Sequence, residues 1–84
     1  MFRWEYNDPQ IQAAAESLPA AALVALTAFM EAVVFDPNEY GRTPGEPVGR
    51  ALRYPSFGGG RGVVTIQIYE PELLVLVLAV QWFG

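Results

Sequence analysis

Residues 19–35, PAAALVALTAFMEAVVF, are apolar at almost every position and contain no glycine and no internal proline. Large aliphatic side chains recur at helical spacing along this stretch, which predicts a helix over Pro19–Phe35. Its polar side chains, Thr27 and Glu31, lie four positions apart and therefore share one narrow stripe. Because so apolar a helix has to bury most of its surface, we expect a second helix and a sheet to cover it on nearly all sides.

The residues before this helix predict a strand and a shorter helix. In Met1–Tyr6 large apolar side chains alternate with polar ones, which is the period of a half-buried strand. Asp8 is favoured at the N-cap of a helix because its side chain accepts a hydrogen bond from a backbone N–H of the first turn. Pro9 is favoured at the first helical position because proline has no backbone N–H that would stay without a partner there. This helix runs to Leu18, where Pro19 ends it and begins the next. The two helices should form a hairpin.

The second half of the chain predicts a meander of three strands. Asp36 and Pro37 end the long helix, and the proline- and glycine-rich stretch up to Gly49 indicates a surface loop. Strands are expected over residues 50–54, 62–69 and 73–83, with a glycine-rich turn at 55–60 and a short turn at 70–72. Such short turns make neighbouring strands antiparallel. The last strand is apolar on both faces and is expected inside the sheet.

These elements predict one α+β domain over residues 1–84, in the order β-α-α-β-β-β. A helical hairpin packs on a mostly antiparallel four-stranded sheet, and the helices make the crossover if the first strand joins that sheet. The length suits a single domain, and an apolar share of 52% is enough to fill its core.

The chain contains no cysteine and no histidine, which excludes disulfides and zinc sites of the usual kind. We therefore expect no metal and no cofactor, and the cytoplasm as the default location. A signal peptide is not expected, because the N-terminal residues fit a strand. The apolar run Ala20–Met30 is too short to span a bilayer. No membrane partner is expected either, because the few basic residues lie outside the long helix and anionic lipid repels the acidic remainder of the chain.

The charge is unevenly distributed. The chain has a net charge of −4 with five arginines and no lysine, and four of the arginines lie within residues 42–61. An acidic chain gains little from the counterion release that drives nucleic-acid binding, so a nucleic-acid partner has only weak support. Arg50, Arg53 and Arg61 form a cradle for a phosphate or an acidic partner if a bulge or a loop brings them to one face. Otherwise they are exposed arginines that keep a sheet edge soluble.

Six segments follow one another in the order and spacing of a known family. They are the short first strand, the Leu18-Pro19 joint, Phe35-Asp36-Pro37 at the end of the hairpin, the basic Arg50–Arg53, Gly60–Val64 and the aliphatic Leu74–Val80. In these segments the chain resembles the RelE/ParE superfamily of bacterial toxins over nearly its whole length.

The resemblance implies a toxin module of a bacterial toxin–antitoxin system, which acts on ribosome-bound mRNA or on DNA gyrase and is neutralised by an antitoxin. The chain departs from the family at Gln81–Gly84, where RNA-cleaving members carry basic and tyrosine residues. The strand-three arginine of the family falls at Arg61 or is replaced by Val63. RNA cleavage also needs a base for the 2′-hydroxyl, which arginine cannot supply because it does not deprotonate in proteins. The base would have to be a carboxylate or a tyrosine, so catalytic residues stay unassigned and an efficient nuclease is not expected.

A second interpretation is a non-catalytic domain for protein interaction or dimerisation that keeps the fold without toxin activity. The long helix and the last strand have more apolar surface than a thin hairpin easily covers, and an antitoxin segment or a second copy would bury it. The candidate interface residues are Phe29, Phe35, Trp82 and Phe83. Alternatively, the alanines of the first helix allow close packing and leave no patch.

Overall fold

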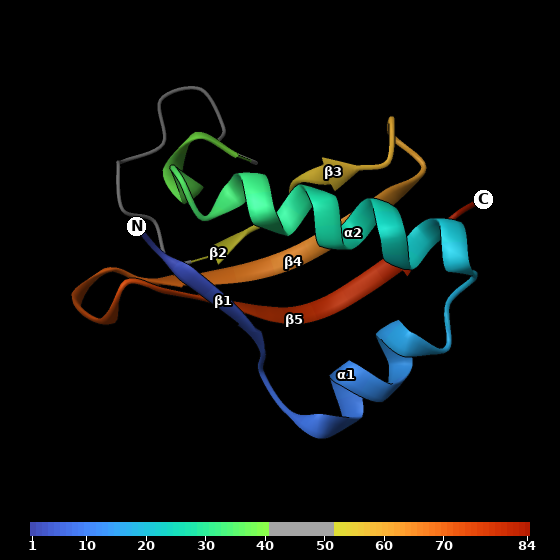
Figure 1. The fold of residues 1–84 in the computed structure, drawn as a ribbon, viewed down its shortest axis with the longest axis horizontal. Helices are drawn as coiled ribbons and strands as arrows, with labels where there is room; N and C mark the ends of the chain where they lie inside the picture. The colour runs from blue at the N-terminus through green and yellow to red at the C-terminus, as the bar shows by residue number, and fades with distance from the viewer. Residues whose placement is uncertain (41–51) are drawn as a thin grey trace.

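The computed structural model describes residues 1–40 and 52–84 of the chain (Figure 1). Within these ranges it has two α-helices, α1 (Pro9–Glu16) and α2 (Ala20–Val33), and two short 3-10 turns, η1 (Pro37–Glu39) and η2 (Glu70–Glu72). The strands are β1 (Arg3–Tyr6), β2 (Leu52–Arg53), β3 (Ser56–Phe57), β4 (Gly62–Tyr69) and β5 (Leu74–Trp82). The predicted order, a strand and two helices followed by further strands, is confirmed.

The helices begin where the local sequence predicts. The Oδ1 atom of Asp8 accepts a hydrogen bond from the backbone N–H of Ile11 at 3.0 Å, and Pro9 takes the first helical position of α1. Pro19 stands at the N-cap of α2, and the last residue of α2 is Val33, slightly before the predicted end. Neither helix, nor any other in the described part of the chain, is long and apolar enough to cross a membrane.

The strands form one sheet in the order β1-β5-β4-β2, with β3 also paired to β4. β1 runs parallel to β5, and every other pair in the described ranges is antiparallel. This confirms the α+β class, the mostly antiparallel sheet and the internal place of the last strand. The chain leaves the β1 edge through α1 and α2 and returns at the opposite edge, as Figure 1 shows.

The expected turn at residues 55–60 is partly a strand, so the sheet has five strands instead of four. Ser56–Phe57 pair with the start of β4 in the same register that Leu52–Arg53 keep with its later residues. Pro55 between them has no N–H to donate, but its carbonyl still accepts from Val64 at 3.0 Å. The turn itself is made by Gly58–Arg61, and its three glycines all have positive φ. Of the expected strand 50–54, residues 50 and 51 lie outside the described residues.

The core lies between α2 and one face of the sheet. α2 buries Leu26, Met30 and Val33 completely. The sheet contributes alternate residues of β4 and β5, namely Val64, Ile66, Val75 and Val77. This alternation fixes which face of every neighbouring strand meets the helix.

Coverage of α2 differs from the expectation. The helix is buried on one side only: on the other side Val24 is 69% exposed, and Phe35, just after the end of α2, is 73% exposed. α1 packs mainly on β1 and β5, and Figure 1 shows it beside the C-terminal half of β5 and not along α2. Most outward positions of α2 are alanines, whose small apolar area makes exposure inexpensive, so the helix does not need a cover on all sides.

Candidate functional site

Arg53, one of the predicted anion-binding residues, is part of the core. It pairs with Ile66, so its side chain points toward the helices, and it is 0% exposed. Its guanidinium donates from Nη1 to the carbonyl of Leu52 at 3.2 Å and from Nη2 to Oδ1 of Asn38 at 3.4 Å. A buried charge is tolerated only where hydrogen bonds replace its lost hydration. Arg53 therefore joins β2 to η1, and its guanidinium does not face solvent.

A polar connection continues from this buried arginine to the surface. The side-chain amide of Asn38 donates from Nδ2 to Oε1 of Glu70 at 2.7 Å. Asn38 thus accepts from Arg53 on one side and donates to Glu70 on the other. The three side chains link β2, η1 and η2, which are far apart in the sequence.

Arg61, the second predicted anion-binding residue, lies at the other end of β4. It is exposed in the turn before Gly62, and its guanidinium carbon lies 5.0 Å from the centre of the Trp82 ring. A cation over an indole face is attracted by the ring quadrupole. The carbonyl of Arg61 also accepts from the N–H of Phe83 at 2.8 Å. Arg61 therefore fixes the end of β5 and does not meet Arg53, while Arg50 lies outside the described residues.

The sheet face opposite the helices is mainly neutral. One row across it runs from Leu52 through Gln67 and Leu76 to Glu5. Of the two positions that the resemblance allowed for a strand-three arginine, Val63 is a half-buried residue of β4 and Arg61 lies in the preceding turn. The described part of this face therefore offers hydroxyl, amide and aliphatic groups, with charged side chains on β1 at its edge, in place of a row of cations.

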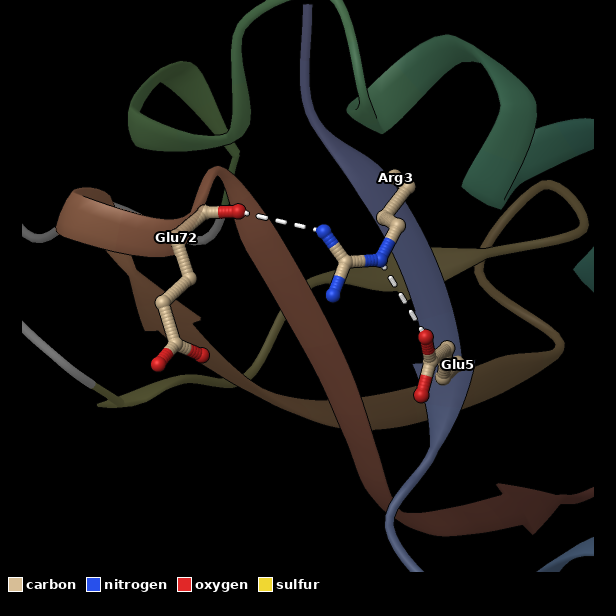
Figure 2. A network of polar contacts seen from close by, with 3 residues as sticks. All are labelled: Arg3, Glu5 and Glu72. Atoms are coloured by element: carbon tan, nitrogen blue, oxygen red, sulfur yellow. Dashed lines mark hydrogen bonds and ion pairs between the residues drawn. The ribbon is translucent and has the colours of Figure 1, made fainter.

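The ion pair on this face is formed by Arg3 and Glu5 of β1. The Nε atom of Arg3 lies 3.2 Å from Oε2 of Glu5, and Nη1 donates to the carbonyl of Glu72 at 3.2 Å, as Figure 2 shows. The side chains of Arg3 and Glu5 are 61% and 54% exposed, so water screens their attraction. The contact with Glu72 ties the sheet edge to η2 but adds little to stability.

The four predicted interface aromatics fall into two groups. Phe29 and Trp82 are half-buried in an aromatic row, where Phe29 meets Tyr40 at 5.3 Å and Trp82 meets Phe57 at 5.6 Å between ring centres. Such offset and edge contacts belong to a packed interior. The other two, Phe35 and Phe83, are 73% and 68% exposed and are available to a partner.

The sequence reasoning missed Val24 as an interface candidate. Val24 and Ala28 line a shallow groove on α2 together with Leu23, Thr27 and Glu31. The signal was present in the spacing, because Val24 and Ala28 lie on the helix face opposite Leu26 and Met30. A search for clusters of three or more His, Cys, Asp or Glu that could hold a metal finds none among residues 1–40 and 52–84.

Tyr6 is the ionisable group with a shifted pKa in the described part of the chain. Burial raises the pKa of its phenol above the ordinary value of 10.0, and the carboxylate of Glu16 raises it further. Tyr6 packs edge-on against Trp4 at 5.3 Å on β1, whereas Arg53 lies on β2 at the far edge of the sheet. The shift therefore reflects packing and does not create a proton acceptor near an arginine.

With this geometry established, comparison with solved structures defines the fold. The chain is similar to a chain of the intact E. coli RelBE toxin–antitoxin complex, with a TM-score of 0.76 and 14% identity over 98% of this chain and 96% of that one. It is similar to the isolated E. coli RelE toxin, with a TM-score of 0.75 and 13% identity over 100% of this chain and 86% of that one. A chain of the archaeal RelE–RelB complex from Pyrococcus horikoshii OT3 gives a TM-score of 0.68 and 19% identity, covering 99% and 96%. The chain has the RelE-like fold, which confirms the fold that the sequence resemblance implied.

Sequence comparison adds no closer relative. No family model matches the chain, and no curated protein matches it. The structural likeness thus holds at identities of 13 to 19%, where the backbone is shared and most side chains differ.

Proposed function

We propose that this chain is the toxin module of a bacterial toxin–antitoxin pair and that an antitoxin protein binds it in the cytoplasm. The observation that carries the proposal is the similarity over 98% of the chain to a component of the RelBE complex. A chain of a second complex, the archaeal RelE–RelB complex, is similar to 99% of this chain. In the first of these neighbours a protein of this fold belongs to a toxin–antitoxin complex, and in the second it belongs to a RelE–RelB complex.

The chemistry of the side chains favours a toxin that acts by binding. The chain has no histidine, cysteine or lysine to take or give a proton near neutral pH. Arg53 is enclosed in the core and Arg61 is stacked on Trp82, so neither is placed to stabilise a phosphorane together with the other. We therefore propose that the module engages its target, ribosome-bound mRNA or gyrase, without an efficient cleavage step.

Induced expression in a bacterial host tests the proposal. We expect growth arrest that is relieved when the neighbouring open reading frame is expressed together with this chain. Ile66→Asp is the control, because a carboxylate at a fully buried position unfolds the domain and should abolish the arrest. Normal growth at a high level of folded wild-type protein would reject a toxin function.

A second candidate function is an interaction domain that keeps the fold without toxicity. The acidic charge of −4 and the exposed Val24 and Phe35 favour it, because an exposed apolar helix face fits a protein partner better than a polyanion. Light scattering after size-exclusion chromatography checks it. A strictly monomeric protein with no co-purifying partner would contradict this alternative.

A further inference from the structure

The face of α2 that points away from the sheet, together with the residue that follows the helix end, carries an exposed apolar stripe. We call its five residues the outer stripe: Ala21, Val24, Ala28, Ala32 and Phe35. Successive members are three or four positions apart, so they lie above one another on one side of the helix. All five are exposed, with Val24 at 69% and Phe35 at 73%. Phe35 follows the end of α2, and its N–H donates to the carbonyl of Ala32 at 3.3 Å, which keeps it against the last turn of the helix.

The order of small and large side chains along the outer stripe fits the same stripe of a second copy whose helix runs antiparallel. The stripe is centred on Ala28, with Ala21 and Phe35 seven positions away on either side. A two-fold axis through Ala28 therefore places Phe35 against Ala21 of the second copy, and Val24 against Ala32. Each large side chain meets an alanine, which is the alternation that close helix packing needs. A parallel pair in register would instead bring Phe35 against Phe35 and leave gaps between the alanines.

Charges at the ends of α2 fit the same arrangement. α2 begins without a side-chain cap and has no acidic residue in its first turn, so the cap and first turn do not compensate the partial positive charge of its N-terminus. The antiparallel pair places Asp36 opposite Ala20, at this N-terminus of the second copy. Asp36 is exposed, and its side chain makes no capping hydrogen bond to η1. A carboxylate at this end of the partner helix is favourable.

The remaining charge beside the outer stripe does not oppose the pair. Glu31 is exposed and falls opposite Ala25 of the second copy, three positions from the axis. The two Glu31 side chains are then six positions apart, about 9 Å along the helices at about 1.5 Å per residue. Salt screens exposed like charges at about this separation.

From these observations we propose that two copies of this chain associate through antiparallel α2 helices, with Ala28 on the two-fold axis. The contact is one helix wide and therefore smaller than the roughly 1,600 Å² of a standard stable interface. The dimer is reversible and forms at micromolar or higher concentration. The proposal does not depend on toxin activity, because it concerns only how copies of the chain associate.

Charge substitution on the axis tests the dimer by sedimentation equilibrium. Ala28→Glu puts two like charges in contact at the centre and should weaken the dimer by at least about tenfold. Ala28→Lys should do the same, and an equimolar mixture of the two variants should recover a dimer, because opposite charges then meet on the axis. Ala13→Glu adds the same charge at an exposed position of α1 and should leave the dimer unchanged. A wild-type protein that stays monomeric at millimolar concentration, or an Ala28→Glu variant that dimerises like wild type, would overturn the proposal.

Disulfide cross-linking tests the direction of the helices, since the chain has no cysteine of its own. In the antiparallel pair Val24 faces Ala32, so a mixture of Val24→Cys and Ala32→Cys chains should cross-link faster than either chain alone. Faster cross-linking of each variant with itself indicates a parallel pair and rejects the arrangement. The far-UV circular dichroism of every variant should match wild type, because all four substituted positions are exposed. If Ala28→Glu arrests growth but is monomeric, the toxin function and the dimer are shown to be separate.

Discussion

At the residue scale, Asn38 accepts one of the hydrogen bonds that the buried guanidinium of Arg53 donates. Asn38→Ala removes this acceptor and the bond to Glu70. We expect the free energy of unfolding to fall by about 1–3 kcal/mol, because a hydrogen bond to a buried charge is lost. Urea titration followed by circular dichroism measures the change. Gln12→Ala is the control, since Gln12 bonds Glu16 at an exposed site, and an equal loss in both variants would contradict the role of Asn38.

Ionisation of the Tyr6 phenol should make the free energy of unfolding fall at alkaline pH. Burial first, and Glu16 second, raise the pKa of its phenol in the native state above 10.0. The native state therefore holds the proton more tightly than the unfolded chain, and this stabilisation is lost as the pH rises from about 10 through the native pKa. Urea midpoints measured from pH 8 to pH 11 should fall less steeply in Tyr6→Phe than in wild type. Tyr54→Phe, at a 61% exposed position, should follow wild type, and identical slopes in all three proteins would exclude Tyr6 as the source.

The sequence shows where the arginines lie along the chain but not where their side chains point. A shift of one residue in the register of β2 against β4 would turn Arg53 from the core to the opposite face. That register depends on the three glycines of the turn, whose conformational freedom allows more than one turn length. The contact between Arg61 and Trp82 could not be predicted either. It joins the turn before β4 to the end of β5, so it depends on the register of these two strands.

At the scale of the elements, the turn Gly58–Gly60 has a definite steric requirement. Gly58 and Gly59 have φ angles of 63° and 69°, so alanine at either position should cost about 1–2 kcal/mol of backbone energy. A Cβ atom at Gly58 would also lie 3.0 Å from the Trp82 ring, whereas at Gly59 it meets nothing within 4 Å. Gly58→Ala should therefore lower the thermal midpoint further than Gly59→Ala in differential scanning calorimetry. Equal midpoints would show that the ring does not restrict this turn.

Local chemistry explains which elements could be predicted. Asp8 and Pro9 specify the start of α1 through capping and the missing proline N–H, so this boundary follows from two neighbouring residues. The end is less exact, because α1 stops at Glu16 and not at the predicted Leu18. β3 was missed because Pro55 and the glycines after Phe57 are typical of a turn, although the strand register continues past Pro55 to Phe57. The solvent exposure of one side of α2 was not predicted, for a different reason. Periodicity shows which residues share a face, but not whether another element covers that face.

At the scale of the whole molecule, the first and the last strand of the chain pair with each other. The parallel register of Arg3 with Leu74 and of Tyr6 with Val77 joins the first strand to the last. No sequence signal sets this pairing, because parallel neighbours need a long connection and the sequence leaves their partners open. The pairing nevertheless makes the sheet one unit, since β5 lies between β1 and β4. The first strand can therefore leave the sheet only by exposing the packed side of β5.

The pairing of β1 with β5 predicts that the chain unfolds as a single domain. Trp4 on β1 and Trp82 at the end of β5 both pack against the same core cluster, from opposite ends of the sequence. Trp4→Phe and Trp82→Phe each leave one tryptophan as a local fluorescence probe. In each variant the urea transition seen by fluorescence should coincide with that seen by far-UV circular dichroism, because an edge strand and the core it completes lose their packing together. Comparing two probes within one variant removes any effect of the substitution on overall stability. A Trp4 transition at lower urea than the circular dichroism transition would show that β1 detaches first, and the single cooperative unit would be wrong.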